Sequence, residues 1–107
     1  MDDTERLRRL IINDAGAAQR ALSFDADQSL TLDPKAIALV RLAALVAVHG
    51  AVASFGAQSD AALAAGASTS EIIDVLIAVA PVVGLPCTVA AAPRLALALG
   101  YDLEDER

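Results

Sequence analysis

The sequence predicts an all-α fold, a helical bundle of about five helices in a single domain over residues 1–107. Three observations support this prediction. Apolar residues recur at helical spacing, capping signals bound the apolar segments, and no stretch alternates apolar and polar residues as a strand does. A chain of 107 residues also fits one domain and is too short for two.

The first expected helix covers about residues 3–22 and is amphipathic. Arginines separate apolar residues that recur at helical spacing. Residues 23–31 show no periodicity, so we expect a loop there. The apolar positions are Leu7, Leu10, Ile11, Ala15, Ala18 and Leu22.

The second expected helix begins at Asp33-Pro34, where Asp caps the helix and Pro occupies the first turn. It runs to His49-Gly50, and Gly50 ends or kinks it. The segment carries two cations and is otherwise apolar on every face, which is typical of a helix that its neighbours bury.

Glycines, prolines and a capping box set the limits of the remaining helices. A third helix covers about residues 51–65 and ends at Gly66, and Ser68 to Glu71 form a capping box that begins the fourth. The fourth ends near residues 81–84. In the fifth we expect a start at Pro86, a kink or division at Pro93, where the ring collides with the Val89 carbonyl, and an end at Gly100 before an acidic tail over residues 102–107.

The apolar content is high for so small a chain. Hydrophobic residues make up 56% of the sequence, and a small chain leaves much of its surface exposed. Apolar surface of this extent on a soluble protein usually marks contacts between subunits. We therefore expect a homo-oligomer.

Composition also excludes several classes of function. Aromatic residues make up 3% of the chain and the net charge is −6, so the rings and cations that bind nucleic acids are scarce. The single cysteine, Cys87, excludes an intrachain disulfide, a CxxC redox pair and a cysteine zinc cluster, and one histidine leaves few other metal sites. We expect no nucleic-acid partner, no metal and no cofactor. A lone thiol and an acidic start without an apolar leader indicate the cytoplasm.

Two uncharged stretches, residues 42–59 and 75–93, approach the length of a membrane span. Alanine dominates them where Leu, Ile and Phe would favour insertion, and Gly and Pro interrupt both. Their flanks also lack the basic clusters that fix topology. We therefore expect no membrane partner.

Two segments carry a family resemblance: LDPKAIALVRLAALVAV from Leu32, and AALAAGASTSEIIDVLIAVAPVVGLP from Ala61. Their order resembles the carboxymuconolactone decarboxylase family, whose relatives include alkylhydroperoxidases of the AhpD type. The resemblance covers about residues 30–100. It implies an AhpD-like all-α bundle whose subunits interlock, and we expect a trimer or hexamer.

The family's functional positions hold other residue types in this sequence. AhpD-like members carry a CxxC pair followed four residues later by His. By the resemblance the two Cys positions fall on Ala51 and Ser54, the His position on Gln58, and a preceding Glu position near Ala38 and Leu39. A thiol peroxidase needs a thiolate and usually a resolving thiol, so that activity is the least favoured. Decarboxylase-type members use a His at the Gln58 position; Gln donates and accepts hydrogen bonds but transfers no proton.

His49, Gln58 and Ser54 are the candidate site residues near the second and third helices. His49 is the only side chain that titrates near neutrality, and it is either a helix-end residue that interacts with the dipole or a relocated proton donor. Gln58 is either a polar surface residue or a hydrogen-bonding contact to a ligand. We expect Ser54 to contact the ligand as well.

Arg41 and Arg94 are isolated cations in apolar helices. Either could bind a substrate carboxylate, and either could pair with an acidic residue of its own or a neighbouring subunit. Cys87 lies in the first turn of a helix, where the dipole favours a thiolate, but free Cys is usually buried, so we expect it in the core. Glu71 and Asp74 are helix-capping residues rather than a catalytic pair.

Two functional interpretations remain. The protein is a carboxymuconolactone decarboxylase-like lyase that acts on a small carboxylated organic molecule in an interhelical pocket, with His49 and Gln58 as catalytic residues. Alternatively, it is a non-catalytic helical oligomer, ligand-binding or structural, that has lost the family's catalytic residues.

Overall fold

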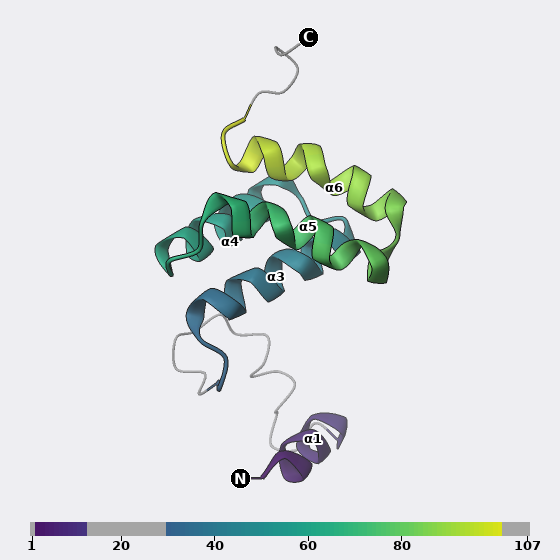
Figure 1. Cartoon of the computed structure of the whole chain (residues 1–107). Helices are drawn as coiled ribbons and strands as arrows, with labels where there is room; N and C mark the ends of the chain where they lie inside the picture. The colour runs from purple at the N-terminus through teal and green to yellow at the C-terminus, as the bar shows by residue number, and fades with distance from the viewer. Residues whose placement is uncertain (1, 13–29, 102–107) are drawn as a thin grey trace. The chain divides into compact units, whose positions relative to one another are not determined.

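The structure, a computed structural model, describes residues 2–12 and 30–101 and contains five α-helices in these ranges (Figure 1). The expected all-α class is confirmed. The chain divides into two units, residues 1–31 and residues 32–107, which are described separately. The helices are α1 (Asp3–Ile12), α3 (Pro34–Val48), α4 (Val52–Ala64), α5 (Thr69–Val83) and α6 (Leu85–Ala98).

In the first unit, α1 is the described part of the expected amphipathic helix. Asp2 Oδ1 accepts the backbone N–H of Glu5 at 2.8 Å, as an N-cap does. The Glu5 carboxylate also pairs with Arg8 at 2.7 Å and Arg9 at 3.3 Å. No residue of the helix is buried, and its apolar side chains are exposed. The rest of the expected helix and the loop over residues 23–31 lie outside the described residues, except for residues 30 and 31.

The predicted capping signals set most helix ends of the second unit. Asp33 Oδ1 accepts the N–H of Ala36 at 2.7 Å and begins α3. Ser68 and Glu71 form the expected capping box of α5, with reciprocal bonds of 3.0 and 2.9 Å. Gly66 follows α4 at φ +99° and Gly100 follows α6 at φ +86°, the left-handed region that glycine adopts without strain.

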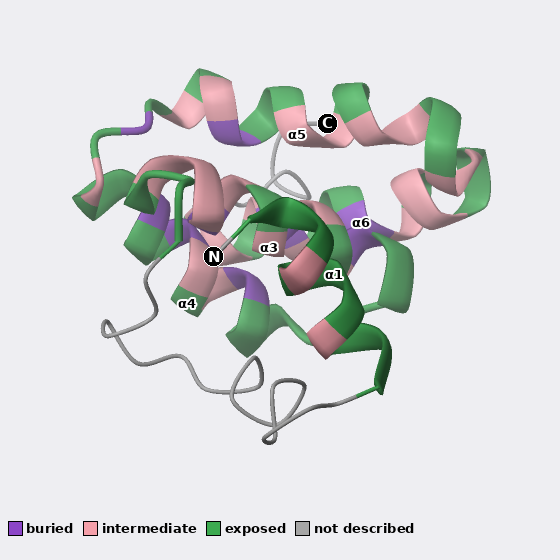
Figure 2. Ribbon diagram, turned by 90° about the horizontal axis from the view of Figure 1, so that it is seen from below, coloured by how far each residue is buried: buried purple, intermediate pink, exposed green. Residues whose placement is uncertain are grey.

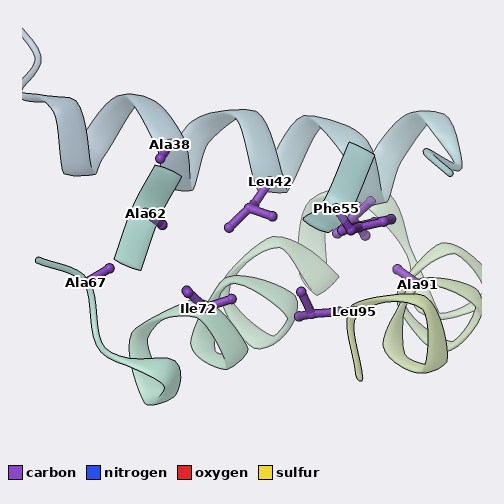
Figure 3. Packing of buried hydrophobic residues seen from close by; sticks show 9 residues of the cluster. Ala38, Leu42, Phe55, Ala62, Ala67, Ile72, Ala91 and Leu95 are labelled. Atoms are coloured by element: carbon purple, nitrogen blue, oxygen red, sulfur yellow. The ribbon is translucent and has the colours of Figure 1, made fainter. Parts of the chain in front are cut away.

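The core lies between α3, α4, α5 and α6. Large apolar side chains from all four helices converge there and are almost fully buried (Figure 3). Burial of each such side chain contributes about 1.5–3 kcal/mol relative to leaving it exposed. In Figure 2 buried segments occur on all four of these helices. The largest are Leu42 and Val46 of α3, Phe55 of α4, Ile72 of α5 and Leu95 of α6.

One face of α3 is not covered within a single chain, since Val40 and Val48 are 56% and 69% exposed. The division expected as one outcome at Pro93 does not occur, because α6 is continuous from Leu85 to Ala98. Because Val89 and Pro93 are both exposed, water can bond the Val89 carbonyl that Pro93 leaves without an N–H partner.

The lengths and compositions of the described helices test whether any of them could cross a membrane. None of them combines the length and the apolar character that crossing a bilayer requires.

Candidate functional site

Alternating helix direction places four helix ends at the same end of the second unit. Short links, at residues 49–51, residues 65–68 and Gly84, join successive helices, so neighbours along the chain run in opposite directions (Figure 1). The C-terminal ends of α3 and α5 therefore lie with the N-terminal ends of α4 and α6. We call this the His49 end.

Lys35 and Glu71 mark the opposite end of the unit. Lys35 Nζ lies 2.6 Å from Glu71 Oε2, which joins the first turn of α3 to the first turn of α5. This ion pair, with the Ser68 N–H that bonds the same carboxylate, holds the pKa of Glu71 below its usual value. Glu71 is thus a capping and bridging residue, in line with the sequence-based interpretation.

His49 ends α3 in a left-handed backbone conformation, with φ 58° and ψ 51°. It is the only residue other than glycine with positive φ within the described ranges. The N–H groups of His49 and Gly50 both bond the Leu45 carbonyl, which closes the helix. A Cβ on Gly50 would lie 2.6 Å from Leu45 Cδ2, so close packing favours glycine at position 50. A non-glycine residue in this region usually costs about 1–2 kcal/mol, and such strain often occurs at functional sites.

Cys87 lies in the first turn of α6, which a single residue joins to α5. Gly84 adopts φ 90° and ψ 161°, a region open essentially to glycine alone, and its carbonyl accepts the Thr88 hydroxyl at 3.0 Å. This turn brings Cys87 Sγ to 3.7 Å from His49 Nε2. Cys87 is half-buried and outside the core, so the expectation that it packs in the core is wrong.

The other predicted site residues do not form a cluster with His49 through hydrogen bonds. Ser54 is exposed in the first turn of α4, and Gln58, one turn further along the same face, is half-buried. Neither bonds His49 in the described part of the chain. Arg41 is half-buried on α3.

Arg94 lies on the same face of α6 as Cys87, because the two residues are two helical turns, about 10 Å, apart. The Cα–Cβ bonds of a helix tilt toward its N-terminus, and the N-terminal end of α6 belongs to the His49 end. Arg94 Nη1 is buried and has no hydrogen-bond partner among the described residues. Glu71 pairs with Lys35 and not with Arg94. A pair between subunits stays a prediction.

No three His, Cys, Asp or Glu side chains gather as metal ligands in residues 2–12 and 30–101. The chemistry that the His49 end offers is that of an imidazole beside a thiol. Imidazole moves protons near neutrality, and a thiol next to imidazole can act as a nucleophile.

The sequence profile of the carboxymuconolactone decarboxylase family matches residues 13–97, more than half of the chain. The protein belongs to the carboxymuconolactone decarboxylase family. Searches of curated proteins and of solved structures each returned no significant match. The match spans α3, α4 and α5 and nearly all of α6, so the His49 end lies within the carboxymuconolactone decarboxylase region.

Sequence reasoning considered His49 and Cys87 separately and missed their contact in this decarboxylase-family bundle. The two residues are 38 positions apart. One signal could have indicated it. His49 was expected where the second helix ends and Cys87 where the fifth begins, and alternating helix directions place those two points at the same end of a bundle.

Proposed function

We propose that this protein is a carboxymuconolactone decarboxylase-like lyase that removes the carboxyl group of a small organic acid at the His49 end. The observation that carries the proposal is the position of His49. Its exposed imidazole is held at the junction of α3, α4 and α6 by a strained backbone, within a chain that belongs to the family.

His49 supplies the proton that decarboxylation consumes. When the carbon–carboxylate bond breaks, carbon dioxide leaves and the electron pair stays on the carbon. That carbon then takes a proton, and the imidazolium form of His49 is the natural donor. Gln58 cannot replace it in this step, since an amide donates hydrogen bonds but does not transfer protons at neutral pH.

Arg94 is the preferred anchor for the substrate carboxylate. Its buried Nη1 has no hydrogen-bond partner in the described residues, and an unpaired buried donor costs folding free energy. A bound carboxylate would accept a hydrogen bond from this group and remove that cost. Arg94 also lies on the face of α6 that carries Cys87. Arg41 is the second candidate anchor, from α3.

Ser54 and Gln58 are positioned on one face of α4 to bind the rest of the molecule. Their hydroxyl and amide groups can donate to and accept from a substrate carbonyl. With His49 they would line a pocket at the junction of α3, α4 and α6. These roles make Ser54 and Gln58 binding residues and leave proton transfer to His49.

The proposal is tested by carbon dioxide release from carboxymuconolactone, the compound in the family's name. We expect turnover by the wild type and a loss of about 100-fold or more in His49→Asn, because general acid catalysis contributes that much. Asn tolerates the left-handed conformation, so this variant should keep the fold. Gln58→Ala should raise KM more than it lowers kcat.

Asp60→Asn is the matched control, since Asp60 is an exposed residue of α4 outside the proposed site. It should keep wild-type turnover. If His49→Asn decarboxylates as fast as Asp60→Asn, His49 is not the proton donor and the proposed function is wrong.

The exposed apolar residues of α5 and α6 support self-association as a second role, with or without catalysis. Every exposed residue of α6 is apolar, and Leu85, Val89 and Leu97 are 71%, 60% and 60% exposed. On α5, Ile77 and Val82 are 69% and 84% exposed. We infer that these faces pack against other copies of the chain in a homo-oligomer, a trimer or a hexamer.

A further inference from the structure

His49 and Cys87 have the arrangement of a base and a nucleophile. Nε2 lies 3.7 Å from Sγ. His49 sits in the left-handed turn that ends α3, and Cys87 follows the Gly84 turn that begins α6, so two separate turns fix the positions of the two residues. An imidazole nitrogen beside a thiol can take its proton and leave a thiolate, the reactive form of cysteine. Decarboxylation as proposed needs the imidazole and gives the thiol no role.

The pair is open to small molecules. His49 is exposed and Cys87 is half-buried. The thiol therefore belongs to a residue that is partly open to solvent and lies beside an exposed histidine. A cysteine that served only to fill the core would be covered on all sides, and this one is not.

The first turn of α6 adds donors for a developing negative charge. No side chain among the described residues caps this helix. Pro86 has no N–H, so Leu85 and Cys87 carry the N–H groups of the first turn, and these groups point outward from the helix end. Donors of this kind stabilise the oxyanion that forms when a nucleophile attacks a carbonyl.

We propose that Cys87 is the nucleophile of an acyl-transfer site that takes small activated esters or thioesters. Sγ bonds to the carbonyl carbon, the carbonyl electron pair moves to oxygen, and the thiol proton passes to His49 Nε2. The leaving group then departs with that proton, and a thioester on Cys87 remains. Water attacks the thioester carbon, its proton passes through His49 to Sγ, and the free acid is released.

Acyl transfer through a thioester suits this chain better than redox chemistry of the cysteine. The sequence contains one cysteine, so the chain has no second thiol to form or resolve an internal disulfide. Acyl transfer needs only a nucleophile, a base and oxyanion donors, and residues 49 and 85–87 hold all three.

The test uses p-nitrophenyl acetate as the acyl donor and follows intact mass and p-nitrophenolate release. In the folded protein we expect one acetyl group, located on Cys87 by peptide mapping. Release of p-nitrophenolate should be at least about 100-fold slower in His49→Asn, the contribution expected of a general base. Cys87→Ser should abolish the thioester and keep the helical circular dichroism of the wild type. Asp60→Asn should behave as the wild type does.

Three results would each overturn the proposal: acetylation on lysine or the N-terminus in place of Cys87, equal rates in His49→Asn and wild type, or equal acylation of Cys87 in the folded and the guanidinium-unfolded chain. The last comparison does not depend on any substitution. The acylation and decarboxylation assays are separate readouts, so a protein that releases no carbon dioxide but acetylates Cys87 would contradict only the proposed lyase function.

Discussion

The carboxylate of Glu71 accepts the Ser68 N–H at 2.9 Å and pairs with Lys35 Nζ at 2.6 Å. One side chain therefore completes the capping box of α5 and links it to the first turn of α3. The two helices are parallel, and this contact lies at the end of the unit opposite to His49.

A pH dependence follows from this contact. Because the folded state holds the pKa of Glu71 below its usual value of 4.5, the carboxylate stabilises the fold at pH values above 4.5. That contribution is lost as the pH falls through the lowered pKa of the folded state. Urea unfolding of wild type and Glu71→Gln at neutral pH and in steps below pH 4.5 should show two curves that converge in acid. Asp60→Asn serves as the control, and an equal pH slope in all three proteins would contradict the assignment.

His49→Gly should stabilise the protein while it removes the proposed proton donor. Glycine adopts the left-handed conformation freely, so the substitution relieves strain of about 1 kcal/mol. His49→Ala is the matched variant, because it also lacks the ring but keeps the Cβ that causes the strain. Chemical unfolding should place the Gly variant about 1 kcal/mol above the Ala variant. Equal stabilities would mean that the turn after α3 carries no strain.

The helix ends could be predicted from sequence because each depends on residues within one turn. Asp33, Ser68 and Gly66 act on backbone groups three or fewer positions away, and the structure confirms all three. The contact of His49 with Cys87 depends on how α3 and α6 pack, so no local pattern contains it. The wrong core assignment of Cys87 has the same cause, since the general tendency of free cysteines to be buried does not depend on how two particular helices pack.

Two prolines show that a solvent-exposed helix tolerates proline better than the rule that proline breaks helices predicts. Pro93 was expected to kink or divide its helix, and the division does not occur: both α6 and α5, which contains Pro81, are continuous. In each case the residue four positions earlier is exposed, Val89 at 60% and Ile77 at 69%. Water can reach the carbonyl that the proline leaves without a donor, so the penalty is smaller than in a buried helix.

Gly84→Ala should both destabilise the protein and disturb the His49 end. The φ of 90° and ψ of 161° at this position are strained for any residue with a Cβ, with a cost of about 1–3 kcal/mol. Since Gly84 sets the direction in which α6 begins, the Cys87 thiol should also move relative to His49. Thermal unfolding and the rate of Cys87 alkylation by iodoacetamide measure the two effects. Gly56→Ala, where a Cβ meets nothing within 4 Å, is the control and should not change the alkylation rate.

Ser59→Ala should be neutral or stabilising, although the residue is 1% exposed. The Ser59 hydroxyl is buried on α4 without a hydrogen-bond partner among the described residues. An unpaired buried polar group costs about 1–3 kcal/mol, and alanine is the better helix former. Equilibrium unfolding should show a gain of up to about 1 kcal/mol. A clear loss of stability would indicate that the hydroxyl has a partner, such as a bound ligand or another subunit.

Charge placed on the outward face of α6 should dissociate the oligomer without unfolding its subunits. Val89 and Leu97 are both 60% exposed in a single chain, so Val89→Lys or Leu97→Glu adds no strain to the core. Between subunits, the same side chains would bury an unpaired charge, which costs several kcal/mol per copy. Native mass spectrometry should show a closed oligomer for the wild type and a 10.9 kDa monomer for each variant. Asp60→Lys, a change of charge at an exposed position of α4, tests whether the response is specific to the apolar faces of α5 and α6, and it should leave the oligomer assembled. A wild type that is itself monomeric at micromolar concentration would show that the apolar faces of α5 and α6 tolerate water, and self-association would then have no support.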